Sequence, residues 1–440
     1  MTEQMTESEK ISGAPNSLSM DSFVVELTKH HREVLVAALL TWVLVANAFH
    51  SSMTTGVLMD VKCFYLAAQD LADGAELYGA KSAFLYLPLI PLLLKPLLPL
   101  GFATISKIWL GLNLVAFTGS AMLVARATGD HFRNACIVYC GILLIGMHNW
   151  AFSMELLGAN CDMILALIFS GMILSIRLAK FKTFAILVAV GTAFKFWFFG
   201  LVGYLLLRRK FREAALCILL SAAVTALLFQ IVGWHQLELL ARTIRLYSER
   251  KISPDIIMQS ISGFAIVHLD KNLFVQPLAA NSGLRTLFTV CCDGLVATVL
   301  CATLWFQPGT QFIKETEKLC LVLISIFLVT PICHVSYAVV IIPAVAMIIF
   351  SRDNVSKTTK FLCFVLYLIL TRVQVLMQIG LERGQTDSIA ALLVSAPFFW
   401  YVALWMVLVC EIALNQRSPK SIVSAQPQIP VISDTTLTSL

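Results

Sequence analysis

The chain consists mostly of apolar runs of about 20 residues, separated by short polar stretches that often carry basic residues. A run of this length is what an α-helix needs to cross the hydrocarbon core of a bilayer. The pattern predicts membrane spans at 34–51, 105–125, 134–151, 154–176, 183–207, 214–233, 286–306, 319–334, 335–350, 361–380 and 389–414.

The composition leads to the same class. Hydrophobic residues make up 58% of the chain and charged residues 13%, and the mean hydropathy is +0.83. So much apolar surface does not fit in a soluble core, and we expect an all-α, polytopic membrane protein with about 11 to 12 membrane helices. The net charge of +6 is attributed to Lys and Arg in loops, so nucleic acid is not an expected partner. The 12 Cys are scattered and are read as packing residues.

The two ends of the chain are polar. Residues 1–33 lack the short apolar region and cleavage site of a secretory signal, so the first span stays as an anchor and 1–33 is expected to be a cytoplasmic segment. Residues 34–414 are expected to form one transmembrane domain. Residues 415–440, rich in Ser, Thr, Pro and Gln, are expected to be a disordered cytoplasmic tail.

Basic residues set the orientation. Lys29 and Arg32 precede the first span, and further bases occupy later short loops, which should be cytoplasmic. The apolar segment 183–207 has bases at both ends, so we expect two short helices that meet near Lys195 and return to the same side. The segment 84–100 contains four Pro and Lys95, and we place it in the outer interface. Residues 52–104 then form the first extracytoplasmic loop, with an interfacial helix at 60–73, and residues 234–285 form a second.

This topology brings unusual polar residues toward the outer face, where intramembrane charge is expensive and usually functional. The carboxylate of Asp60 opens the first loop, and the others are Glu155, Asn160, Lys195, Gln259, Ser260 and His334. The loop 234–285 adds Arg242 and Arg245, which suit a phosphate. A solvated helix face that touches lipid headgroups explains these two arginines equally well.

The order of motifs resembles glycosyltransferase family 87, the polyprenyl-phosphate-dependent mannosyltransferases of the GT-C superfamily, from about residue 34 to 350. The resemblance rests on five stretches, in order DVKCFYLAAQDLADGAELY with FLYLPLIPLLLKPL, LLGANCDMILALIF (156–169), GTAFKFWFFGLVGYLLLRRKFREAA (191–215), MQSISGF (258–264) and TPICHVSYAVVIIPA (330–344). Three features depart from the pattern. Ala159 stands where the family has Gln, Met258 where Asn is common, and His334 comes earlier than in many members.

The resemblance implies a GT-C-like catalytic domain that transfers a hexose, with mannose as the expected sugar, from a polyprenyl-phosphate donor to a lipid or glycan acceptor, with inversion. It assigns the general base to Asp60. Fixed cations for the leaving phosphate would be Lys195, His334, Arg242 and Arg245. Contacts to the sugar or acceptor would come from Asn160, Gln259, Ser260, Tyr65 and Tyr86. Residue 62 is Lys, so no Asp-x-Asp pair indicates a divalent metal. The expected location is the cytoplasmic (inner) cell membrane, with the site outside.

Plainer interpretations stand beside these. Asp60 could be a helix N-cap, Lys195 could extend its amine to water, and His334 could make a structural hydrogen bond. Asp162 and the aromatic clusters at 196–199 and 398–401 are read as packing residues or interface anchors, and Glu155 as a reserve carboxylate. For the whole chain, a transporter or flippase of a lipid-linked sugar is the alternative, although no internal repeat is visible. An assembly subunit without activity is a third.

Overall fold

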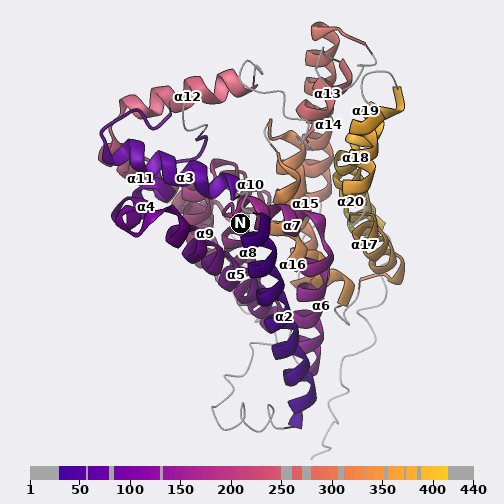
Figure 1. Cartoon of the computed structure of the whole chain (residues 1–440). Coiled ribbons are helices and arrows are strands. Elements are labelled where there is room, and N and C mark those ends of the chain that lie inside the picture. The colour runs from indigo at the N-terminus through magenta and orange to yellow at the C-terminus, as the bar shows by residue number, and fades with distance from the viewer. Residues whose placement is uncertain are drawn as a thin grey trace, which may run out of the picture.

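The computed structural model describes residues 29–55, 58–78, 84–128, 132–248, 260–269, 279–305, 312–331, 333–350, 355–370, 373–383 and 388–414. These residues form helices joined by short turns, and no strand occurs among them. Figure 1 shows most of the long helices running side by side in one bundle. The expected all-α, multi-pass class is confirmed. The expected N-terminal segment, apart from residues 29–33, and the expected tail 415–440 lie outside the described residues.

Five helical stretches in the described part of the chain are long and apolar enough to cross a membrane. They are His31–Ala48, Leu89–Thr128, Phe211–Val232, Ser282–Leu304 and Ala396–Leu414. A sixth arises if Phe132–His148 and Ala151–Gly158, bent by 71°, count as one broken span. Shorter apolar helices at Phe181–Phe194, Phe196–Leu207 and Ala338–Phe350 occupy further predicted spans. Of the 11 to 12 membrane helices predicted, five or six in the described part of the chain are long and apolar enough to cross a membrane.

The centre of the bundle is α8 (Asp162–Arg177), most of whose residues are buried. It packs against α5 (Gly101–Thr128), α9 (Phe181–Phe194), α15 (Phe312–Val329) and α16 (Ala338–Phe350). Around this centre lie α2 (His31–Thr55), α6 (Phe132–His148) and α11 (Phe211–Val232). The C-terminal part adds α13 (Ile261–Leu269), α14 (Ser282–Trp305), α17 (Lys357–Leu370), α18 (Val373–Arg383), α19 (Ser388–Val394) and α20 (Ala396–Leu414).

The segment 183–207 folds back on itself, as predicted. After α9 the chain is extended at Lys195 and continues as η2 (Phe196–Leu201) and α10 (Val202–Leu207). The rings of Phe184 and Tyr204 stack at 5.3 Å, and the Lys210 amine lies 4.8 Å from the centre of the Phe181 ring, so the two ends of the segment are neighbours. The two arms form a hairpin with Lys195 at its apex.

The open end of this hairpin is tied to α15 through Glu315. One carboxylate oxygen of Glu315 accepts from Arg208 at 2.8 Å and from the Tyr204 hydroxyl at 2.9 Å. The other accepts from Lys318 at 3.0 Å. The sequence places Arg208 and Lys318 in two loops on the same side of the membrane. In the structure Lys318 lies inside α15, and the carboxylate that it shares with Arg208 brings the two residues together.

The first loop contains the predicted short helices. These are α3 (Met59–Ala72), α4 (Leu89–Leu94) and the 3₁₀ helix η1 (Lys95–Leu100), which leads into α5. Helix α3 packs on α4 and η1. In Figure 1, α12 (His235–Ser248) lies crosswise at the upper left, near α3 and α11. The hydroxyl of Thr243 donates to the carbonyl of Tyr78 at 3.3 Å, so α12 docks on the end of the first loop.

Two predicted spans are each divided into two helices, and the break in 389–414 falls at Ser395, between α19 and α20. The stretch 154–176 is not a single helix, because α7 (Trp150–Gly158) ends at Gly158 and α8 begins at Asp162. Ala159 adopts a left-handed conformation with φ 51°, which ends α7. The indole N–H of Trp109 donates to the carbonyls of Ala159 and Asn160, at 2.8 and 3.2 Å, and so satisfies the backbone groups freed by the break. The break divides the predicted helix between Gly158 and Asp162, where the polar residues Asn160 and Asp162 lie.

Candidate active site

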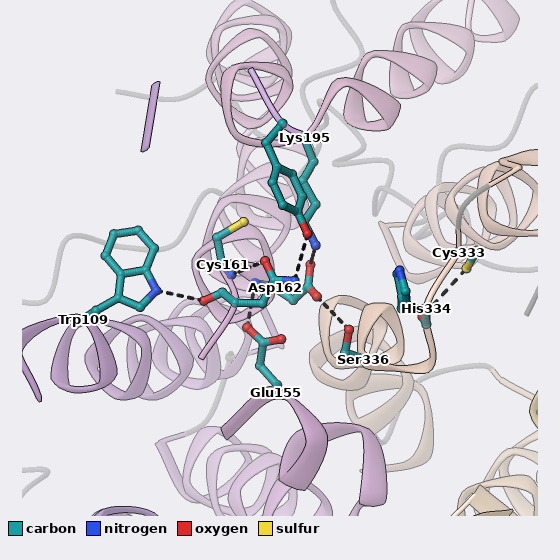
Figure 2. Close-up of polar contacts among 10 residues, drawn as sticks. Trp109, Glu155, Cys161, Asp162, Lys195, Cys333, His334 and Ser336 are labelled. Atoms are coloured by element: carbon teal, nitrogen blue, oxygen red, sulfur yellow. Dashed lines mark hydrogen bonds and ion pairs between the residues drawn. The ribbon is translucent and has the colours of Figure 1, made fainter. Parts of the chain in front are cut away.

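The core of the site is a buried ion pair between Lys195 and Asp162. The Lys195 amine donates to Oδ1 of Asp162 at 2.6 Å, and the two side chains are 1% and 0% exposed. The other oxygen of Asp162 accepts from the Ser336 hydroxyl at 3.1 Å. Figure 2 shows Asp162 between Lys195 and Ser336. A buried charge is tolerated when it is paired and hydrogen-bonded, and this arrangement satisfies both conditions.

Glu155 binds the backbone at Asp162. Its Oε1 accepts from the backbone N–H of Asp162 at 2.9 Å, which secures the first residue of α8. The side chain is 1% exposed, and Oε2 has no hydrogen-bond partner among the described residues. Glu155 is therefore a supporting residue in a polar cluster that also includes Asp60, Asp162 and Lys195.

Asp60 reaches this cluster from α3. It lies in the first turn of the helix, where the partial positive charge of the helix end favours a carboxylate. The amide of Asn160 donates to it, and Lys195, His334 and Asp162 lie within electrostatic reach. Burial raises the pKa of Asp60 above its ordinary value, and the charges of Lys195 and His334 oppose that rise.

Gly158 makes room for Asp60. A Cβ atom built on Gly158 would lie 2.6 Å from Oδ2 of Asp60 and 3.5 Å from its carboxyl carbon. The carboxylate therefore rests directly against the last turn of α7. This contact gives a physical reason for a glycine two residues before Asn160.

A small cavity of about 40 Å³ lies at the hairpin apex. Its walls are formed by Leu85, Tyr86, Lys195, Phe196, Trp197, His334 and Tyr337. Asn160 connects it to Asp60, because its amide donates both to Asp60 and to the Tyr86 hydroxyl, the latter at 3.1 Å. The cavity and the carboxylate are thus two parts of one site.

Hydrogen-bond donors dominate the polar part of the cavity wall. Lys195 can only donate, and its amine lies 4.1 Å from the centre of the Tyr337 ring and 5.3 Å from that of Tyr86. The Tyr86 oxygen already accepts from Asn160, so its own proton is available for a ligand. Such a wall suits an anion with several oxygens, such as a phosphate, better than a metal ion.

Several predicted residues come together here and others do not. Asp60, Asn160, Tyr86, Lys195 and His334 form one site. Ser260 is buried and caps α13, and its hydroxyl lies 3.5 Å from the carbonyl of Pro331, three residues before His334.

The remaining predicted residues lie elsewhere. Tyr65 packs on Phe102 at 5.4 Å, away from the cavity wall. Arg242 and Arg245 are exposed on α12 and do not line the cavity, so their phosphate role stays a prediction. Gln259 lies outside the described residues.

The structure also bears on the plainer interpretations of Asp60, Lys195 and Asp162. Asp60 is not the N-cap, because Leu58 occupies that position and Asp60 is the second helical residue. Lys195 does not extend toward water, since it is buried and paired. The interpretation of Asp162 as a packing residue or interface anchor is also wrong. Its signal in the sequence was a carboxylate inside an apolar stretch of a chain that also buries a lysine, and such groups usually pair.

Metal binding finds no support in the described part of the structure. No group of three or more His, Cys, Asp or Glu side chains there is arranged to hold a metal ion. The carboxylates of the site are instead occupied by Lys195, Ser336 and backbone or amide N–H groups.

Comparison with known proteins adds one finding. The family model described as Glycosyltransferase family 87 matches residues 84–331. This range covers more than half of the chain and includes Tyr86, Asn160, Asp162 and Lys195. A search of curated proteins found no match.

Proposed function

Because the chain belongs to glycosyltransferase family 87 and is therefore a membrane glycosyltransferase, we propose that it transfers a hexose from a polyprenyl-phosphate donor to a lipid or glycan acceptor. Mannose is the sugar that the motifs favour. The transfer takes place with inversion on the extracytoplasmic side of the cytoplasmic membrane. The family assignment disfavours the transporter and the inactive subunit.

The observation that carries this proposal is that Asn160 links Asp60 to a cavity whose wall is rich in hydrogen-bond donors. A base and an anion site side by side are what an inverting transfer from a sugar phosphate requires. The remote ends of the substrate can be bound elsewhere, because only the reacting atoms have to lie between these two parts.

In the proposed reaction, the acceptor hydroxyl oxygen forms a bond to the anomeric carbon while Asp60 takes the hydroxyl proton. The bond from the anomeric carbon to the phosphate oxygen breaks, and polyprenyl phosphate leaves with the electron pair. Lys195 and His334 stabilise the negative charge that develops on that oxygen. The raised pKa of Asp60 suits a base, because proton transfer works best when the pKa approaches the working pH.

Within this reaction Asp162 and Glu155 are positioning residues. Asp162 holds the Lys195 amine in the wall of the cavity, and Ser336 holds Asp162. Asn160 orients Asp60. These contacts fix the site before substrate binds, and such preorganisation is a large part of electrostatic catalysis.

The donor class is tested with purified protein in lipid nanodiscs. Labelled mannose is offered as polyprenyl-phosphate mannose or as a nucleotide-linked sugar, together with a membrane extract as the source of acceptors. We expect transfer from the lipid-linked donor alone. Transfer from the nucleotide sugar, with none from the lipid-linked one, would contradict the proposed donor.

A further inference from the structure

Trp197 lines the cavity and follows Lys195 directly, yet its indole N–H is not used by the fold. The residue is 5% exposed. Its Nε1 atom is buried and has no hydrogen-bond partner among the described residues. No step proposed above uses this group.

A buried donor without a partner is costly. Native structures pair nearly all buried polar groups, and buried Trp N–H groups usually find an acceptor. Because folding removes this N–H from water, no hydrogen bond to solvent replaces the missing one, and the full cost in free energy remains. An unpaired N–H on a residue that lines a cavity therefore points to a ligand that supplies the acceptor.

Packing does not explain the choice of tryptophan. Three aromatic rings pack around the indole, with Phe327 at 4.9 Å, Phe198 at 5.3 Å and Tyr337 at 5.4 Å. The contact with Phe327 is edge-to-face at 81°, an arrangement that another aromatic ring can also make. The N–H adds nothing to these contacts.

The position of Trp197 identifies the chemistry of the acceptor. Lys195 and Trp197 can only donate, and the Tyr86 hydroxyl has a proton to give because its oxygen accepts from Asn160. These groups share one cavity wall. An oxyanion with several oxygens can accept from all of them, whereas a cation cannot.

The surroundings favour an anion carried by a lipid. Phe196 lines the cavity and is also 42% exposed. Residues three apart eclipse each other in a 3₁₀ helix, so Phe199, 40% exposed, continues the same face. An apolar surface thus leads from the cavity to the outside of the bundle.

We propose that the Trp197 indole N–H donates a hydrogen bond to the phosphate of the donor lipid and of the polyprenyl phosphate that leaves. Trp197 then recognises the phosphate, and the apolar polyprenyl chain runs from the cavity over Phe196 and Phe199. This inference rests on the proposed function, since it names a further residue of the donor site.

The test is equilibrium binding of radiolabelled decaprenyl phosphate to the full chain in nanodiscs. The variants are Trp197→Phe and a chain with benzothienylalanine at position 197, which keeps the shape of the indole and lacks its N–H. Trp234→Phe is the control, because Trp234 is exposed and its N–H donates to Gln230 at 2.9 Å. Uncharged decaprenol and inorganic phosphate are the competitors.

We expect both position-197 variants to bind decaprenyl phosphate on the order of tenfold more weakly, since hydrogen bonds to charged groups are the stronger ones. Competition by decaprenol should not change, and competition by inorganic phosphate should weaken. The control should bind like wild type. A position-197 variant that binds like wild type would overturn this inference alone, and so would equal weakening for decaprenol. A wild type that does not bind decaprenyl phosphate would overturn the proposed donor as well.

Discussion

The contact between Gly158 and Asp60 allows the position of the base to be changed without removing it. In Gly158→Ala the new methyl group would lie 2.6 Å from Oδ2 of Asp60, whereas ordinary contact begins at 3.4 Å. The carboxylate must therefore move by about 0.8 Å. The backbone of Gly158 is not left-handed, so alanine adds no backbone strain.

Displacement of a catalytic group by about 1 Å can cost on the order of 100-fold in rate. We expect Gly158→Ala to lower kcat for mannose transfer by roughly 10-fold to 100-fold. Its melting temperature should stay at the wild-type value or rise, because alanine favours a helix by up to about 1 kcal/mol over glycine. Loss of activity without loss of stability separates this effect from misfolding.

The matched control is Gly111→Ala in α5. A Cβ there meets nothing within 4 Å, so activity should be unchanged. In an Asp60→Asn background, Gly158→Ala should add little, since both changes act on the same group. Full activity of Gly158→Ala with the wild-type donor would refute the reasoning that ties rate to the position of Asp60.

The buried carboxylates lead to four further predictions. Since the pKa of Asp60 is raised, kcat/KM of the wild type should fall as the pH drops through that raised value, and a profile without this fall would contradict the role of Asp60 as the base. By the same shift, the ionised form of Asp60 is disfavoured in the fold, so Asp60→Asn should melt above wild type at high pH and lose this advantage below the ordinary carboxyl pKa. Asp162→Ala leaves Lys195 unpaired and should lower the free energy of unfolding by about 3–5 kcal/mol, measured by thermal unfolding. Adding Lys195→Met should restore stability but not sugar transfer. An Asp162→Ala variant as stable as wild type would contradict the pairing. Glu155→Gln keeps an acceptor for the N–H of Asp162 and should retain most activity, whereas Glu155→Ala should lose it; equal loss in both would show that the charge of Glu155 matters instead.

Much of the architecture could be predicted from the sequence. Apolar runs of bilayer length indicate the helical class, and bases at both ends of 183–207 indicate a hairpin with Lys195 at the apex. The structure shows that hairpin through the contacts of Phe184 with Tyr204 and of Lys210 with Phe181. The positions of basic residues are informative here because they indicate which ends of a segment lie on the same side of the membrane.

The details of the site could not be predicted in the same way. The break at Ala159 depends on the indole of Trp109, which lies 50 residues away in sequence. The need for Gly158 depends on a carboxylate from another helix. The exposed position of Arg242 depends on which face of α12 docks, and a basic helix alone does not say. The pairing of Asp162 with Lys195 was easier to predict, because two opposite charges in apolar surroundings are expected to form an ion pair.

The central claim is that Asp60 is the base of a transfer from a lipid-linked sugar. The most direct measurement compares wild type, Asp60→Asn and Asp70→Asn in transfer of labelled mannose from polyprenyl-phosphate mannose to membrane extracts. Asp70 lies on the same helix and is not among the residues that line the cavity. We predict that transfer disappears in folded Asp60→Asn and persists in Asp70→Asn. Undiminished transfer by Asp60→Asn would contradict the account.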